Sequence, residues 1–288
     1  MTTYGVTGAT GKLGRLVLDE LLALVPAGEV VAFGRETARL ADFAERGVIV
    51  RAMDYDAPEA MAEALTGVDR LLLISGSALG QRPRQHGNVI EAAKEAGVSY
   101  IAYTSILRAD TTPIRLGAEH RASEELLAAS GIPHDLLRNG WYNENYMASL
   151  EQQVASGLIT GAQGEGRISS AARADLAAGA AFVLVNGKGG EIYNLAGDNG
   201  WTMTEFAAEL GRQTGRTIRY QDMSEDDYAQ SLREAGMPDA YALVVANSAH
   251  ATSQSALEEN SRTLSRLTGR PTTPIGETIA RKLAGSLD

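Results

Sequence analysis

The sequence contains no cysteine and few histidines or lysines, and these shortages exclude several kinds of chemistry. Without cysteine, the 288-residue chain can form no disulfide, use no thiolate nucleophile and hold no iron–sulfur cluster through cysteine. The four histidines, His86, His120, His134 and His250, show no metal-ligand spacing. We therefore expect neither a metal site nor cysteine-based redox chemistry.

The sequence also lacks long apolar stretches and an excess of positive charge. Runs such as residues 71–74 are too short to cross a bilayer, and the N-terminus lacks the features of a signal peptide. The net charge of −10, from 26 basic and 36 acidic residues, argues against nucleic acid or an anionic membrane as the main partner. The 44% hydrophobic content predicts a packed globular core. We expect a cytoplasmic protein that does not insert into membranes.

Short apolar runs alternate with amphipathic segments through the first half of the chain. The runs cover residues 4–6, 30–33, 48–51, 71–74, 100–104 and 135–137. Because they are continuous rather than alternating, they are typical of buried parallel strands, and the segments between them have helical periodicity. The pattern predicts an α/β fold of the Rossmann type, a doubly wound parallel sheet with helices on both faces.

The pattern changes after about residue 140. The helical segment ARADLAAGAAFVLV precedes two strand-like segments, EIYNL and TIRYQDM. Thr202 and Glu205 have the spacing of a capping box, and Ser224 opens another helical segment. We predict a dinucleotide-binding domain over residues 1–140 and a smaller α/β lobe over residues 141–288. The lobe is expected to pack on the first domain, to be partly interleaved with it and to cover the substrate cleft.

A glycine motif, GVTGATGKLG (residues 5–14), follows the first expected strand. Gly8, Gly11 and Gly14 are spaced three apart at the start of the first expected helix. Small residues there allow a tight turn and bring backbone N–H groups close to a pyrophosphate, which the helix N-terminus attracts. The alternative is a glycine-rich turn without a ligand. The flanking strand and helix favour dinucleotide binding.

The second expected strand, VVAFGR, bears on the kind of dinucleotide. NAD sites of this type usually end this strand with an acid that binds the ribose 2′-hydroxyl. Here the strand ends in Arg35, with Arg39 four residues later. A guanidinium suits a 2′-phosphate in charge and in shape, although the adjacent Glu36 could serve a ribose or pair with Arg35. The sequence favours NADPH over NADH, with a solvated surface charge as the alternative for Arg35.

The loop ISGS (residues 74–77) follows the fourth expected strand. Ligands of open parallel sheets lie beyond the carboxyl ends of the strands, so residues 75–77 are expected beside the nicotinamide ribose. The alternative is a turn made of turn-forming residues without a ligand.

These motifs resemble the short-chain dehydrogenase superfamily, in its atypical NmrA-like branch. Ordinary members of the superfamily carry Tyr-x-x-x-Lys on the helix after the fifth strand. In this chain, the residues four positions before its four lysines are Gly8, Ile90, Leu184 and Thr278. The chain therefore has no such catalytic dyad.

The missing dyad restricts the acceptor. Hydride delivery to a simple ketone creates an alkoxide, whose conjugate acid has a pKa of about 15.7, so a positioned proton donor is valuable. Hydride delivery to a quinone creates a phenolate-like anion, whose conjugate acid has a pKa of about 10. That anion can take its proton from water. A site without the dyad therefore fits an electron-poor, conjugated acceptor.

The middle of the chain is similar to the bacterial NADPH-dependent quinone oxidoreductases of this branch. The segments GVSYIAYTSILRAD, GIPHDLLRNGWYNENY and RADLAAGAAFVL carry this resemblance, which spans nearly the whole chain. It implies direct hydride transfer from NADPH to a quinone without flavin. The cofactor contacts that it implies are Gly8, Ala9, Thr10, Gly11, Lys12, Leu13, Arg35, Ser75, Gly76, Ser77, Asn139, Gly140, Trp141, Tyr142, Asn143, Glu144 and Arg173.

The catalytic residues stay unassigned, with His120, Tyr142 and Asn143 as candidates. His120 occupies the place where many NmrA-like relatives have a lysine, and it is either a hydrogen-bond or proton donor or a satisfied histidine at a helix start. In RNGWYNENY, Trp141 and Tyr142 are expected to stack on quinone or nicotinamide, and Asn143 and Asn145 to bind carbonyl oxygens. The alternative for this segment is packing between the sheet and the lobe.

Two other functions stay open from the sequence. One is reduction of cationic triphenylmethane dyes, whose electron-poor central carbon also accepts hydride without an acid. The other is a non-catalytic redox sensor that binds a dinucleotide and regulates a partner protein. Helix faces such as TARLADFAERG leave a homodimer open, although a solvated helix gives the same pattern.

Overall fold

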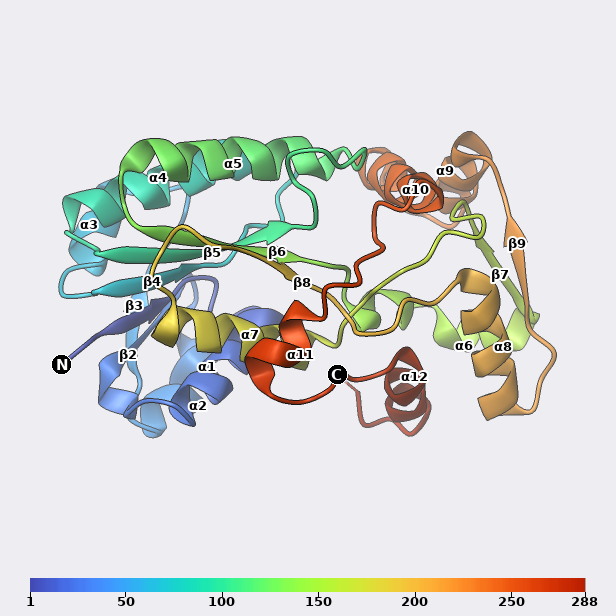
Figure 1. Cartoon of the computed structure of the whole chain (residues 1–288), viewed down its shortest axis with the longest axis horizontal. Coiled ribbons are helices and arrows are strands. Elements are labelled where there is room, and N and C mark those ends of the chain that lie inside the picture. The colour runs from blue at the N-terminus through green and yellow to red at the C-terminus, as the bar shows by residue number, and fades with distance from the viewer. Residues whose placement is uncertain (288) are drawn as a thin grey trace. The chain divides into compact units, whose positions relative to one another are not determined.

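The computed structural model describes residues 1–287, which form two compact units (Figure 1). The first unit comprises residues 1–109, 119–139 and 173–195. The second unit comprises residues 110–118, 140–172 and those from 196 onward. The boundary drawn from the sequence at residues 140 and 141 assigns residues 173–195 to the C-terminal lobe, whereas the structure places them in the first unit.

The first unit is built on a parallel sheet of seven strands in the order β3-β2-β1-β4-β5-β6-β8. The strands are β1 (Tyr4–Val6), β2 (Val30–Gly34), β3 (Ile49–Ala52), β4 (Arg70–Leu73), β5 (Tyr100–Ile106), β6 (His134–Asn139) and β8 (Ile192–Leu195). The six strands expected from the apolar runs are confirmed. The order of these six reverses between β1 and β4, as in the doubly wound dinucleotide-binding fold.

Helices cover both faces of this sheet: α3, α4 and α5 lie on one face, and α1, α2 and α7 on the other (Figure 1). Their bounds are α1 (Lys12–Leu22), α2 (Ala41–Glu45), α3 (Met61–Ala64), α4 (Arg82–Glu95), α5 (Leu116–Ser130) and α7 (Arg173–Asn186). Short 3₁₀ helices, η1 (Ala27–Glu29), η2 (Thr37–Leu40) and η3 (Pro58–Ala60), complete the connections. The Rossmann-type α/β fold is therefore confirmed.

Residues 173–195 join the first unit through buried and partly buried polar contacts as well as strand pairing. Arg70 donates from Nε to the carbonyl of Leu184, at 2.6 Å, near the end of α7. The buried carboxylate of Asp135 accepts from the Tyr100 hydroxyl at 2.8 Å and from the Glu191 N–H at 2.9 Å, just before β8. These partners are between 35 and 114 residues apart in the chain. Local sequence patterns therefore do not reveal that residues 173–195 come back to the first unit.

The second unit contains a two-stranded parallel sheet and most of the C-terminal helices. Its strands are β7 (Leu158–Gly161) and β9 (Arg219–Asp222). Its helices are η4 (Asn143–Tyr146), α6 (Leu150–Ser156), α8 (Met203–Thr214), α9 (Glu225–Glu234), α10 (Asp239–Ser253), α11 (Thr263–Thr268) and α12 (Ile275–Leu283). Throughout residues 1–287, no helix combines the length and apolar character that crossing a membrane requires.

The expected helix starts of the second unit are confirmed at atomic detail. The Glu205 N–H donates to Thr202 Oγ1 at 3.1 Å, and the Thr202 N–H donates to Glu205 Oε2 at 2.8 Å. This reciprocal pair is a capping box at the start of α8. Ser224 caps α9 by accepting from the Asp227 N–H at 3.1 Å.

Candidate cofactor site

The glycine motif forms the turn between β1 and α1. Gly8 has a φ of 59°, in the left-handed region that favours glycine, and its carbonyl accepts from the Gly11 N–H at 3.0 Å. A Cβ on Gly14 would lie 2.7 Å from the Cα of Ala9. Glycine at position 14 thus lets α1 start directly against the turn, which is the geometry that the spacing predicts.

No side chain among residues 1–287 caps the N-terminus of α1. Gly11, at the N-cap, has no side chain to accept a hydrogen bond, and the first turn has no acidic residue. The first N–H groups of a helix need acceptors, and the helix dipole favours a negatively charged one. Residues 8–13 therefore fit a pyrophosphate.

The carboxyl end of β2 lies against the same turn. A Cβ on Gly34 would lie 2.6 Å from Thr10 Cγ2, and Arg39 donates from Nη2 to the Thr10 carbonyl at 3.4 Å. Arg35 is exposed and makes no hydrogen bond or ion pair with any residue of the described chain, although its charge contributes to lowering the pKa of Asp56. An exposed guanidinium without a hydrogen bond beside the glycine turn fits a 2′-phosphate.

The loop after β4 is held by side chains from neighbouring elements of the first unit. The Ser75 N–H donates to Thr104 Oγ1 of β5 at 2.8 Å, and the Gly76 N–H donates to His86 Nε2 of α4 at 3.0 Å. Ser75 is half-buried and Ser77 is exposed. The backbone of residues 75 and 76 is therefore fixed at the carboxyl edge of the sheet, as predicted from the sequence.

His86 has a fixed protonation state in this arrangement. Its Nε2 accepts from the Gly76 N–H, so the proton of the neutral ring is on Nδ1, which lies 2.8 Å from Ser123 Oγ. The side chain is completely buried, and burial together with the charge of Arg82 lowers its pKa to about 3. From the sequence, His86 was expected only to lie at the start of a helix. No local sequence pattern indicates that it anchors the loop at residues 74–77.

His120, a catalytic candidate, lies near the start of α5. The ring of Tyr103 lies next to those of both His86 and His120. The Nδ1 of His120 is 2.8 Å from the hydroxyl of Tyr103 on β5. Burial, with smaller effects from Arg82 and His86, lowers the pKa of His120 to about 3. His120 is therefore uncharged near neutral pH, where it can form a hydrogen bond but cannot act as an imidazolium acid.

A buried ion pair holds α5 against the ends of β5 and β6. Glu124 accepts from Arg138 Nε at 3.1 Å and from Nη2 at 2.7 Å, and Ser105 donates to the same carboxylate at 2.6 Å. The next residue, Asn139, is buried, and its Oδ1 has no hydrogen-bond partner among residues 1–287. An unpaired buried amide oxygen is rare, and it lies where β6 reaches the carboxyl edge.

Of the remaining predicted contacts, residues 140–144 belong to the second unit and Arg173 to the first. Trp141, Tyr142, Glu144 and Arg173 are half-buried. The backbone around Tyr142 forms a bridge with Ala171.

Asn143 is completely buried within the second unit. Its Nδ2 donates to Thr278 Oγ1 at 3.0 Å, and its Oδ1 accepts from Ser170 Oγ at 2.6 Å. Ser170 Oγ in turn accepts from Trp201 Nε1 at 3.0 Å. The amide of Asn143 thus stabilises the second unit, which differs from the expectation that it binds a substrate carbonyl.

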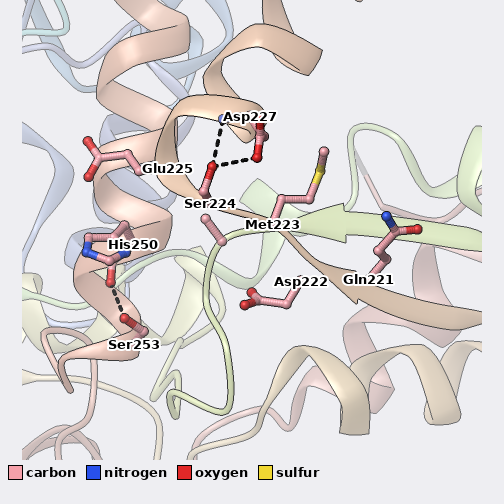
Figure 2. Close-up of a pocket in the computed structure, with 9 residues that line it drawn as sticks. Gln221, Asp222, Met223, Ser224, Glu225, Asp227, His250 and Ser253 are labelled. Carbon is pink, nitrogen blue, oxygen red and sulfur yellow. Dashed lines mark hydrogen bonds between the residues drawn. The ribbon is translucent and has the colours of Figure 1, made fainter.

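The second unit has a pocket of about 630 Å³ between the end of β9, the start of α9 and α10 (Figure 2). Asp222, Glu225 and Asp227 line it, together with His250 of α10. None of the residues predicted to bind the cofactor lines this pocket. Its carboxylates would repel phosphate groups, so it does not suit a dinucleotide.

Comparison with known proteins agrees with the geometry of the first unit. Residues 8–186 match the family model described as NAD(P)H-binding. Quinone oxidoreductase 2 of Escherichia coli (strain K12) is 49% identical over 276 residues, which cover 96% of each chain. The crystal structure of the E. coli NADPH-dependent quinone oxidoreductase with NADPH has a TM-score of 0.96 and 48% identity, over 98% of this chain and all of that one.

Two further proteins are similar to this chain. Triphenylmethane reductase of Citrobacter sp., solved with NADP(H), has a TM-score of 0.93 and 36% identity, over 97% of this chain and all of that one. An NmrA-like family oxidoreductase of Aspergillus flavus is 30% identical, over 79% of this chain and 76% of that one. The resemblance found in the sequence is thereby confirmed. The chain belongs to the NAD(P)H-binding family, in its NmrA-like branch of atypical short-chain dehydrogenases.

Proposed function

We propose that this chain is an NADPH-dependent reductase that transfers hydride directly to a quinone. The observation that carries the proposal is the uncapped glycine turn of the first unit, with the exposed Arg35 next to it and free to form hydrogen bonds. The similarity to quinone oxidoreductase 2 over nearly the full length of both chains supports the same reading.

Each part of the proposed cofactor site has one task. When bound, NADPH supplies the hydride. Residues 8–13 would hold the pyrophosphate with backbone N–H groups, and Arg35 would bind the 2′-phosphate. Residues 75–77, Asn139 and Arg173 of the first unit would border the nicotinamide half.

The kind of hydride acceptor is indicated by the absence of a strong proton donor in the chain. No Tyr-x-x-x-Lys pair exists in the sequence, and His120 is uncharged near neutral pH. Reduction of a quinone needs no strong acid, because the product is a phenolate-like anion that water can protonate. A quinone therefore suits this site better than a simple ketone.

A cationic triphenylmethane dye is the second candidate acceptor. The 36% identity to triphenylmethane reductase over 97% of the chain favours it, and the chemistry again needs no acid. A redox sensor without turnover is a third reading. Parallel assays with quinone and dye separate the two acceptors, and tight NADPH binding without turnover of either would identify the sensor.

The experiment follows NADPH consumption at 340 nm with purified, flavin-free protein and 1,4-benzoquinone. We expect turnover that is faster with NADPH than with NADH. Because charge-assisted hydrogen bonds contribute about 1.5–3 kcal/mol, Arg35→Ala should raise the KM for NADPH by roughly 10- to 100-fold.

NADH provides the internal control, because it lacks the 2′-phosphate. The KM for NADH should change little in Arg35→Ala. An equal loss with both dinucleotides would show that Arg35 does not bind the 2′-phosphate. Absence of quinone turnover in the unmodified protein would contradict the proposed reaction itself.

A further inference from the structure

The hydroxyl of Tyr55 lies where the carboxyl ends of β1 and β4 meet. Tyr55 follows β3, and its Oη is within hydrogen-bond distance of two acceptors, Thr7 Oγ1 at 2.5 Å and the Ile74 carbonyl at 2.9 Å. Thr7 immediately precedes Gly8 of the glycine turn, and Ile74 immediately precedes residues 75–77. One side chain therefore hydrogen-bonds to the residues that precede two segments of the proposed cofactor site.

The hydroxyl of Thr7 connects the same two strands. Its Oγ1 accepts from the Ile74 N–H at 3.0 Å and donates to the Leu72 carbonyl at 3.1 Å. Thr7 is completely buried, and the Tyr55 hydroxyl occupies the second acceptor position of its Oγ1. Burial raises the pKa of Tyr55, so its hydroxyl keeps its proton and acts as a donor within this network. The network joins the end of β1, the end of β4 and the loop after β3.

The ring of Tyr55 is close to the backbone of both segments. A Cβ on Gly8 would lie 3.9 Å from Tyr55 Oη, and a Cβ on Gly76 would lie 3.9 Å from Tyr55 Cδ2. The ring also meets that of His86 edge-on, with 6.3 Å between the centroids. The Tyr55 carbonyl accepts from Asn88 Nδ2 of α4 at 2.9 Å. Tyr55 thus lies against both segments and is itself held by α4.

We propose that Tyr55 is a positioning residue that fixes the separation between the glycine turn and the loop at residues 75–77; this inference rests on the proposed function. In that function the glycine turn holds the pyrophosphate and residues 75–77 border the nicotinamide half, so one NADPH molecule needs both segments at a set separation. Segments that are already in place bind a ligand more tightly, because less conformational freedom is lost on binding. The Tyr55 hydroxyl does not protonate the substrate, because its proton is donated within the network.

The test compares a dinucleotide that needs both segments with a fragment that needs one. NADP⁺ carries the nicotinamide half, whereas adenosine 2′,5′-bisphosphate ends at the 5′-phosphate. Tyr55→Phe keeps the ring and removes the hydroxyl. The variant should bind NADP⁺ about 3- to 10-fold more weakly, as loss of one hydrogen bond would cause, and should bind the fragment within about twofold of the unmodified affinity. Isothermal titration calorimetry measures both affinities.

Tyr100→Phe is the matched control. Tyr100 belongs to the same unit, and its buried hydroxyl donates to Asp135 Oδ2 at 2.8 Å, near the amino ends of β5 and β6. This variant makes the same chemical change and breaks a hydrogen bond of the same sheet, but at the edge opposite the glycine turn. It should bind NADP⁺ like the unmodified protein. Equal weakening of NADP⁺ binding in the two variants would overturn the proposal, because general loosening of the first unit would explain it.

The remaining outcomes separate this inference from the proposed function. Unchanged NADP⁺ affinity in Tyr55→Phe would refute the positioning role and leave the proposed cofactor site intact. An equal loss of affinity for NADP⁺ and for the fragment would also refute it, because the glycine turn alone would then be disturbed. Failure of the unmodified protein to bind NADP⁺ would refute the proposed function and this inference together.

Discussion

At the scale of single residues, glycine shows which features can be predicted from sequence. Gly8, Gly11 and Gly14 are recognisable because their roles lie within one turn and depend on spacing. Gly5 has no such signal. A Cβ on Gly5 would lie 2.9 Å from side-chain atoms of Leu71 and Val68. These neighbours are more than sixty residues away in the chain, so only the folded sheet explains this glycine.

The tight packing of Gly14 leads to a stability prediction. Gly14→Ala should lower the free energy of unfolding by about 1–3 kcal/mol, because the new methyl group has no room beside Ala9. NADPH affinity should fall as well, since the turn must shift. Gly28→Ala is the matched control: Gly28 is exposed, and its Cβ would meet no atom within 4 Å. Urea unfolding measures the stability of both variants, and equal stabilities would show that the turn relaxes freely.

At the scale of helices, strands and loops, the distance along the chain decides what the sequence reveals. The capping box of α8 joins residues three apart, and the strands of the sheet are continuous apolar runs, so both were predicted. The anchoring of Gly76 by His86 joins two elements, and β8 completes a sheet that the chain left at β6. Asn143 shows the same limit, because its partners Ser170 and Thr278 are 27 and 135 residues away. Polar residues in a loop therefore indicate a site but do not distinguish ligand contacts from internal hydrogen bonds.

The capping box provides a prediction at this scale. Thr202→Ala should reduce the stability of the second unit by about 1 kcal/mol, because it removes the hydroxyl that accepts from the Glu205 N–H. Thr217→Ala is the control, since Thr217 is exposed and its hydroxyl makes no hydrogen bond within residues 1–287. Both tryptophans, Trp141 and Trp201, belong to the second unit, so tryptophan fluorescence during urea unfolding reports on that unit. Coincident unfolding curves for the two variants would contradict the prediction.

At the scale of the whole molecule, the acidic balance and the lack of cysteine limit partners and chemistry but do not identify the reaction. The inference of the reaction class required similarity over the full chain length, together with the absence of the Tyr-x-x-x-Lys pair. The homodimer left open by the sequence stays a prediction, which sedimentation analysis can test. The apolar positions Leu40 and Phe43 of TARLADFAERG are buried within the first unit, so that segment does not itself favour an interface.

Global stability should depend on pH through the two buried histidines. The pKa of His86 and that of His120 are about 3 in the folded chain, below the ordinary value of 6.5. Between pH 6.5 and 3 the unfolded chain therefore binds more protons, so acidification destabilises the fold, by up to about 1.4 kcal/mol per pH unit for each histidine. Above pH 6.5 this contribution should be fully present.

The window between pH 7.5 and 5.5 isolates the histidines from the carboxylates. Hydrogen bonds lower the pKa of Asp42, Asp56 and Glu209 from ordinary values of 3.8, 3.8 and 4.5, so their contributions to stability fade only in more acidic solution. We expect a loss of roughly 3 kcal/mol between pH 7.5 and 5.5, measured by urea unfolding with far-UV circular dichroism. His120→Gln should remove about half of this dependence. A stability that stays flat across the window would contradict the prediction, because it would mean that both histidines accept protons within the folded chain as readily as in the unfolded one.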